Sequence, residues 1–233
     1  MPKIYVFYCN RLYNIIVFMS KSETAINFTL FEEFSKRRVS KSEKRRFQII
    51  EKTITELATN GIDSITHDSL AKSCKVSRSL IQHYFPDRDE LFLLAFRYVR
   101  AKFQKLCVDE MQKHDSAQKK LKAYIECACS WPKVAPDDCK VWLLFYYHCG
   151  IKREYKTLNS ELVEQGHARI LALLNDIIGN KKTNDPINIT RAKLIQNLIT
   201  SYFLSVMTEN NSKEFNAELL GATVQLCLSY TRL

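Results

Sequence analysis

Apolar residues recur at helical spacing from about Ser40 to the end of the chain, and no stretch alternates apolar and polar positions as a strand does. The first predicted helix opens at Ser40, which forms a capping box with Glu43. Asn60-Gly61 ends it, with a glycine suited to the left-handed helical conformation. The predicted buried stripe of this helix consists of Phe47, Ile50, Ile54, Leu57 and Ala58.

Two short helices then follow around a tight turn. Thr66 caps the first of them and Ser77 caps the second. Lys75-Val76 form the turn, and Pro86 stops the second helix after about Tyr84. This layout is typical of a helix-turn-helix, whose second helix is sized to enter the DNA major groove. The residues that the first short helix turns inward are Leu70, Ala71 and Cys74.

A long helix and five further helices complete the predicted fold. Asp87 and Glu90 form another capping box, which starts the long helix that runs through Leu106. We therefore predict an all-α protein, in which an N-terminal three-helix helix-turn-helix head is joined by the long helix to a C-terminal helical domain. The five later helices are predicted at about 117–131, 136–150, 152–178, 189–208 and 213–231.

Composition and charge narrow the class of protein. Only five Gly and five Pro in 233 residues argue against a β-rich or low-complexity chain, and 46% hydrophobic residues suffice for a core. A formal charge of +10 favours a polyanionic partner such as nucleic acid. The eight cysteines are scattered over apolar helical faces, so we favour reduced, buried thiols in a cytoplasmic protein over a secreted disulfide scaffold.

The first residues form the one segment outside this pattern. Residues 4–18 are apolar, but Asn10, Arg11 and Asn14 interrupt the run and no small-residue cleavage site follows, which argues against a signal peptide. The segment is also too short and too polar to span a bilayer, so no membrane partner is expected. Our hypothesis is that translation begins at Met19 and that residues 1–39 form a flexible extension, followed by a helix-turn-helix domain at 40–86 and a helical domain at 87–233.

The stretch from Gly61 to Leu91 resembles the TetR family of one-component transcriptional regulators. Within this stretch, the recognition helix and the loop that follows it look closest to the branch of the choline-responsive repressor of glycine-betaine synthesis. The chain departs from the family in its recognition helix, where Ser79-Leu80-Ile81-Gln82 replaces the usual Gly-Thr-Leu-Tyr. The matching positions are Gly61, Thr66, Leu70, Ala71, Val76, Ser77, the run His83-Tyr84-Phe85-Pro86-Asp87-Arg88, and Leu91.

The resemblance implies a homodimer that reads a palindromic DNA operator with one recognition helix per half-site. Arg78 can donate two hydrogen bonds to O6 and N7 of a guanine, and Gln82, four residues later on the same exposed face, can pair with an adenine edge. Thr66 and Ser77 are N-caps in any case, Tyr84 can equally pack the head, and the basic run near residue 40 can be a solvated arm. The predicted DNA-binding residues are Thr66, Ser77, Arg78, Ser79, Gln82, His83, Tyr84, Arg88, Lys44 and Arg45.

The middle of the chain is rich in aromatic residues, which either fill a core or line a ligand cavity between helices. Aromatic faces can enclose a quaternary ammonium, which the resemblance favours. No metal or cofactor is expected, because Cys127 and Cys129 point to different faces of a helix and no other ligand set is present. The predicted ligand-binding residues are Tyr124, Trp131, Trp142, Phe145 and Tyr146.

The last two predicted helices carry apolar stripes that are unusually rich for helices facing water. In the family that the head resembles, two such helices from each subunit form a four-helix interface; the alternative is that they close the core of their own chain. The predicted interface residues are Leu194, Leu198, Tyr202, Leu220, Val224 and Cys227.

These features predict a ligand-responsive transcriptional regulator, most simply a repressor that a small molecule releases from DNA, with residues 87–233 as the sensing and dimerisation domain. An enzyme is not expected, since the sequence contains no nucleophile–base pair, phosphate loop or metal-ligand spacing. A constitutive regulator, or one that senses redox state through thiols such as Cys139 or Cys149, is the alternative.

Overall fold

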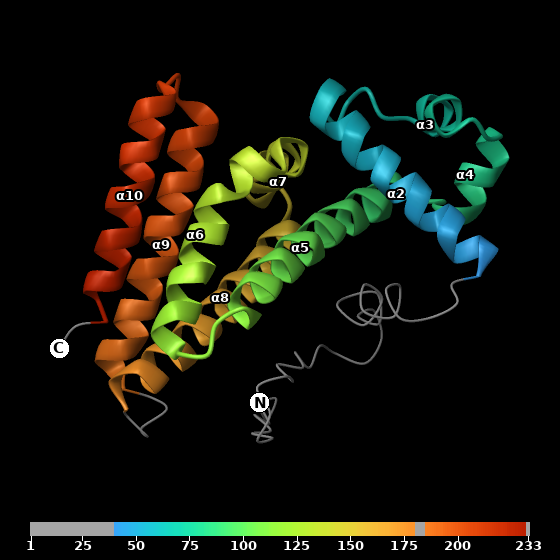
Figure 1. The fold of residues 1–233 in the computed structure, drawn as a ribbon. Coiled ribbons are helices and arrows are strands. Elements are labelled where there is room, and N and C mark those ends of the chain that lie inside the picture. Colours follow the sequence, from blue (N-terminus) through green and yellow to red (C-terminus); the bar gives the residue numbers. More distant parts are fainter. Residues whose placement is uncertain (1–39, 180–184, 232–233) are drawn as a thin grey trace. The chain divides into compact units, whose positions relative to one another are not determined.

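A computed structural model describes residues 40–179 and 185–231 (Figure 1). Within these two ranges every regular element is a helix, which confirms the all-α prediction. The predictions made for residues 1–39, including the start at Met19, lie outside the described ranges. The helices are α2 (Lys41–Asn60), α3 (His67–Cys74), α4 (Arg78–Tyr84), α5 (Arg88–Gln112), α6 (Ala117–Val134), α7 (Pro136–Cys149), α8 (Arg153–Ile178), α9 (Pro186–Thr208) and α10 (Lys213–Ser229).

Local capping signals set most of the helix starts. The Ser40–Glu43 capping box is present, with the Glu43 backbone N–H donating to Ser40 Oγ at 3.2 Å, and Ser77 caps α4 as predicted. The capping box predicted for Asp87 and Glu90 is wrong. Asp87 instead accepts from the backbone N–H of Asp89 at 2.9 Å, two residues on, so the cap satisfies an earlier amide of the same first turn.

Two helices extend further than predicted, because proline is less disruptive at their ends than in a helix interior. Helix α9 begins at Pro186, since a proline in the first turn gives up no intrahelical bond and Asp185 caps it. Helix α6 continues past Pro132 to Val134, and its final turn is closed by the Ala135 N–H, which donates to the Trp131 carbonyl at 2.9 Å.

The backbone at the end of α2 also differs from the prediction. Gly61 has φ +73° and ψ 179°, which is not the left-handed helical conformation but an extended region that only glycine adopts readily. The left-handed position in the head is Lys75, in the turn between α3 and α4, with φ 54° and ψ 49°. The turn of the helix-turn-helix therefore holds Lys75 in a mildly strained conformation. Position 61 requires a glycine, because a side chain there would strain the backbone.

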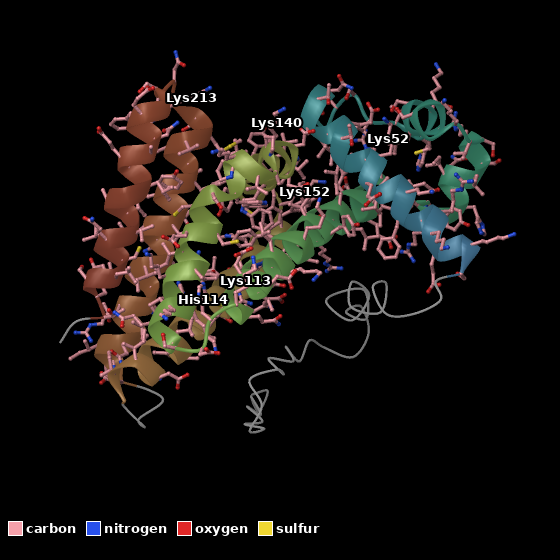
Figure 2. The ribbon with its side chains drawn as sticks, in the orientation of Figure 1. Lys52, Lys113, His114, Lys140, Lys152 and Lys213 are labelled. Carbon is pink, nitrogen blue, oxygen red and sulfur yellow. The ribbon has the colours of Figure 1, made fainter. Side chains whose placement is uncertain are left out.

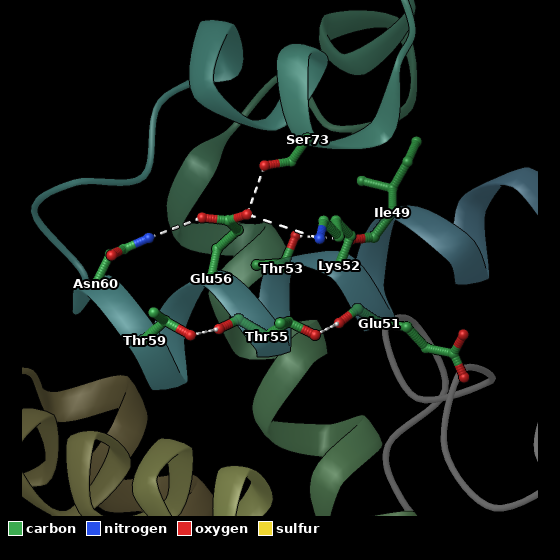
Figure 3. A network of polar contacts seen from close by, with 9 residues as sticks. All are labelled: Ile49, Glu51, Lys52, Thr53, Thr55, Glu56, Thr59, Asn60 and Ser73. Atoms are coloured by element: carbon green, nitrogen blue, oxygen red, sulfur yellow. Dashed lines mark hydrogen bonds and ion pairs between the residues drawn. The ribbon is translucent and has the colours of Figure 1, made fainter.

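A core and a polar network hold the head together. The close view in Figure 3 shows Glu56 of α2 at the centre of that network. Glu56 accepts a hydrogen bond from Ser73 of α3 at 2.5 Å and one from Asn60 at 2.9 Å, and Lys52 lies 3.9 Å away as an ion pair. The apolar core below it consists of Ile49, Ile50, Ile54, Leu57, Ile65, Leu70, Ala71, Ile81 and Phe85, all buried.

The body is built from α5 to α10. Helices α5 and α6 pack together, α8 packs on α9, and α10 lies along α9 (Figure 1). One continuous apolar core connects them, with contributions from α5, α6, α8, α9 and α10. Helix α7 lies at the edge of this core and packs against α5, α6 and α8.

The head is joined to the body through α2, which packs against both α5 and α7. Beside this joint, Lys152 (labelled in Figure 2) donates to Asp89 of α5 at 2.5 Å. His148 of α7 lies nearby, with its ring 5.2 Å from that of Tyr155 and both ring nitrogens buried without a hydrogen-bond partner. Burial, followed by the charge of Lys152, lowers the pKa of His148.

Replacing Gly61 by alanine is expected to destabilise the fold by about 1–3 kcal/mol, since a side chain there occupies a strained backbone region. The free energy of unfolding in urea would measure the loss. Gly150→Ala is the matched control, because Gly150 has ordinary helical angles (φ −74°, ψ −20°). Equal stability of the two variants would contradict the backbone argument.

The protein is also expected to lose stability as the pH falls below about 6.5, the ordinary pKa of histidine. The folded chain holds His148 neutral, so below that pH the unfolded chain binds a proton that the folded chain resists. His148→Phe keeps the ring contact with Tyr155 and should flatten the fall of the melting temperature between pH 7.5 and 5. Tyr147→Phe, at the exposed neighbouring ring, should keep the wild-type slope; an unchanged slope in His148→Phe would refute the assignment.

Candidate DNA-binding surface and ligand cavity

Helix α4 presents one side to the head's core and the other to solvent. Ile81 is buried, and so is Phe85, the residue that ends the helix. Arg78, Ser79 and Gln82 are exposed, as the helix-turn-helix prediction requires of residues that read bases. The predicted base-contacting side chains are therefore free to meet a groove.

Arg78 is held by an acidic residue that sequence reasoning did not single out. Its Nη1 lies 3.0 Å from Oδ2 of Asp68 on α3, and both side chains are more than half exposed. An exposed ion pair of this kind is worth about 0–1 kcal/mol, so a guanine edge can displace the carboxylate at little cost. The pair keeps the guanidinium extended along the surface of α3 and α4.

The remaining predicted DNA contacts lie around this helix. Tyr84 is half-buried and its hydroxyl lies 3.2 Å from Ser42 Oγ, which brings the start of α2 next to the end of α4. Lys44 and Arg45, on the first turns of α2, are exposed. The outlying basic residues Lys36, Arg37 and Arg38 fall outside the described ranges.

Two of the predicted DNA-binding residues, Arg88 and Thr66, also make contacts within the head. Arg88 donates to the Ile65 carbonyl at 3.2 Å and lies 5.6 Å from the Phe92 ring. Thr66 is exposed, and its hydroxyl accepts from the Ser69 backbone N–H at 3.0 Å. His83 is exposed, with its ring edge-on to Tyr84 at 5.4 Å. Arg88, Thr66 and His83 are thus all exposed, as residues that contact DNA have to be.

A cavity of about 80 Å³ lies within the body, between α5, α6, α7, α8 and α9. Four of the five predicted ligand-binding residues line it: Tyr124, Trp131, Trp142 and Tyr146. The fifth, Phe145, does not. Its ring is fully buried behind Trp142, at 4.9 Å from that ring, and faces Phe96 at 5.2 Å.

The aromatic rings at the cavity pack against one another rather than forming an open cage. Trp131 is the centre of the group, with ring centroids 4.5 Å from Phe103, 5.9 Å from Trp142 and 5.8 Å from Phe203. Tyr146 closes the group at 6.2 Å from Phe203. Both interpretations made from the sequence therefore hold in part, since the rings fill the core and also border the cavity.

Sequence reasoning missed the polar part of the wall. Arg100 of α5 lines the cavity and is only 8% exposed, and Asn159, Gln196 and Thr200 also line it. Gly166 makes room for Gln196, because a Cβ atom there would lie 2.4 Å from Gln196 Oε1. An arginine between apolar neighbours at Val99 and Ala101 was the available signal in the sequence.

The thiols do not offer a sensor of the kind considered above. Burial raises the pKa of Cys139 to about 12 and also raises the pKa of Cys149, which keeps both thiols protonated at neutral pH. Cys107 and Cys127 hydrogen-bond to each other in the body's core, and this bond and burial raise the pKa of Cys107. No group of three metal-ligating side chains lies together in the described residues.

The structure divides the predicted interface residues into two sets. Tyr202, Val224 and Cys227 are buried in the core of their own chain, which is the alternative considered for these helices. Leu198 and Leu220 are partly buried against that core, and Leu194 is 40% exposed. A partner can reach only the second set, so the first set serves the fold of the single chain.

Comparisons with known proteins bear on the head and on the fold. Residues 49–95 match the family described as "Bacterial regulatory proteins, tetR family". The chain is 22% identical over 140 residues to the HTH-type transcriptional regulator BetI of Brucella canis. The matched segment covers 60% of this chain and 71% of that protein.

Solved structures share the fold. A transcriptional regulator from Saccharomonospora viridis in complex with choline superposes with a TM-score of 0.65 at 19% identity, over 80% of this chain and 95% of that one. AibR in complex with isovaleryl coenzyme A and operator DNA superposes with a TM-score of 0.58 at 11% identity, over 78% and 97% of the two chains.

The helices of the described part include none that is both long and apolar enough to cross a bilayer. The family match falls on the helix-turn-helix head with its exposed Arg78 and Gln82, and the body has the same fold as regulators of known structure. The head of this chain is therefore similar to the DNA-binding head of the tetR family of bacterial regulatory proteins, and the whole chain is similar in fold to transcriptional regulators of known structure.

Proposed function

We propose that this regulator is a repressor that binds a palindromic operator as a homodimer and is released by a small molecule in the body's cavity. The observation that carries the proposal is the position of α7. This helix contributes Trp142 and Tyr146 to the cavity and also packs against α2 of the head. A ligand that moves α7 therefore acts directly on the helix that supports the DNA-reading pair.

Ring contacts supply the physical connection. Trp142 at the cavity packs against Phe145, whose ring centroid is 6.0 Å from that of Tyr155. Tyr155 in turn packs against His148, with the ring planes tilted by 33°, beside the head–body joint. Because packed rings interdigitate with little free space, a shift of Trp142 has to be accommodated along this series. Rotating the two heads of a dimer changes their separation, which must match the 34–36 Å between successive major grooves.

A homodimer is supported by apolar side chains left exposed on the last two helices. Of eight large hydrophobic residues exposed in the described ranges, five lie on α9 and α10. Ile187 and Leu194 are seven residues apart and Phe215 and Leu226 are eleven apart, spacings that return to the same side of a helix. Two-fold pairing of these faces would bury them and give a palindrome reader its second head.

Arg78→Ala is expected to keep the fold but to lose about 1–3 kcal/mol of the difference in binding free energy between the selected and the scrambled site, because a bidentate contact to a base is removed. Sites would be selected from fragmented genomic DNA with the purified chain, and affinities compared for a selected and a scrambled site. Lys44→Ala is the control. It should weaken binding to both DNAs alike and lower the slope of log affinity against log salt concentration by about one, the value for one phosphate contact. Equal affinity of the wild type for both DNAs would refute operator recognition.

Phe215→Glu combined with Leu226→Glu should convert the dimer to a monomer of 27.2 kDa, because two charges per subunit would be buried without partners. Light scattering after size exclusion measures the mass. Ile151→Glu, at a hydrophobic residue outside α9 and α10 that is more exposed still (60% against 47% for Phe215 and Leu226), should leave the dimer intact. A monomeric wild type would overturn the homodimer, and a dimeric double variant would place the interface elsewhere.

A further inference from the structure

Arg100 carries a buried positive charge on the cavity wall that lacks a counter-ion. Its Nε is buried without a hydrogen-bond partner, and its Nη2 reaches only the Leu162 carbonyl, at a long 3.4 Å. Among the described residues no carboxylate forms an ion pair with it. The buried guanidinium therefore has hydrogen-bonding capacity that the folded chain leaves unused.

A second guanidinium adds to this charge. Arg169 of α8 lies 5.6 Å from the ring of Tyr124, a residue of the cavity wall, and its Nη1 is also buried without a partner. Burial first, and then the charge of Arg169, lowers the pKa of Arg100 to about 10. Arg100 is thus still protonated at neutral pH, and this part of the cavity is strongly electropositive.

The rest of the wall is apolar with a few polar groups. Trp131, Trp142 and Phe203 offer ring surface, and Asn159 together with Gln196 offers amides. Gln196 Oε1 is buried without a hydrogen-bond partner, in the space that Gly166 leaves open. A ligand that fits has a compact apolar body and one anionic end.

We propose that the cavity binds a small organic acid in its carboxylate form, with the carboxylate paired to Arg100 and the apolar body against the aromatic rings. This inference deepens the proposed function by naming the class of effector, and it rests on that function for the effect on DNA. A guanidinium pairs with a carboxylate through two parallel N–H···O hydrogen bonds. The Nε–H of Arg100 has no partner in the folded chain and lies in the plane of the guanidinium, so it can supply one of these two bonds.

The same observations disfavour a quaternary ammonium, the ligand that the family resemblance favours. A cation cage needs ring faces that are free to enclose the cation, whereas the rings here contact one another at 4.5–6.2 Å. Two buried guanidinium groups near the cavity would also repel a cation, and no carboxylate lines the wall to offset them.

Calorimetric titration of the full chain tests the ligand class with matched probes: phenylacetate and hexanoate, their neutral primary amides, phenyl phosphate and choline. Each carboxylate is expected to bind at least tenfold more tightly than its amide, and choline should not bind. A preference for choline, for the amides or for phenyl phosphate over phenylacetate would overturn the proposal, as would binding of none of the probes.

Variants on α5 identify the group responsible. Arg100→Met should abolish the preference for carboxylate over amide, and Arg100→Lys, which keeps the charge without the planar fork, should retain part of it. Arg97→Met is the matched control, since Arg97 lies one turn earlier on α5 and does not line the cavity. A preference that survives in both Arg100 variants would refute the role of this residue. Arg100→Lys keeps this part of the test decisive if Arg100→Met does not fold.

The effect on DNA is measured separately, by titrating each carboxylate into the complex with a selected operator. Carboxylate binding without release of DNA would uphold the ligand class and contradict the proposed mechanism of release. Sequence-specific DNA binding without any carboxylate affinity would uphold the regulator and contradict the ligand class.

Discussion

The packing of α7 between the head and the cavity is the constraint on which the rest of this structure depends. One helix of fourteen residues must fill the joint with α2, support the rings around Phe145, and close one side of the cavity with Trp142 and Tyr146. Because all of these contacts are made by the same short, closely packed helix, a shift of α7 at one of them affects the others. In the proposed function, this arrangement is what would connect a small molecule in the body to a head that it does not touch.

The second organising feature is electrostatic. A buried arginine without a counter-ion is costly, since its guanidinium cannot shed its proton at neutral pH. The body keeps Arg100 in this state, with Arg169 close enough to lower its pKa, whereas two lysines further along α5 have carboxylate partners: Lys102 pairs with Asp138 at 2.7 Å and Lys105 with Asp109 at 2.8 Å. On the cavity wall, this leaves Arg100 as a buried charge without a carboxylate beside it.

Short-range signals made the head predictable. Ser40, Thr66 and Ser77 cap their helices as expected, because a cap depends on residues within one turn of each other. The backbone at Gly61 and the start of α9 at Pro186 were less well predicted. There, the sequence indicates that glycine or proline has a special role, while the final geometry depends on how the following segment packs.

The sequence by itself determined an all-α chain with a helix-turn-helix near residues 61–91, four of the residues around a cavity, and the exposure of Arg78 and Gln82. Only the tertiary structure decided which apolar residues remain exposed on α9 and α10, that Phe145 turns away from the cavity, and that Arg100 lies on its wall without a carboxylate. Helical periodicity records which face of a helix is apolar, but partners on other helices decide what that face meets. A buried charge is recognised as unpaired only when all of its neighbours in space are known.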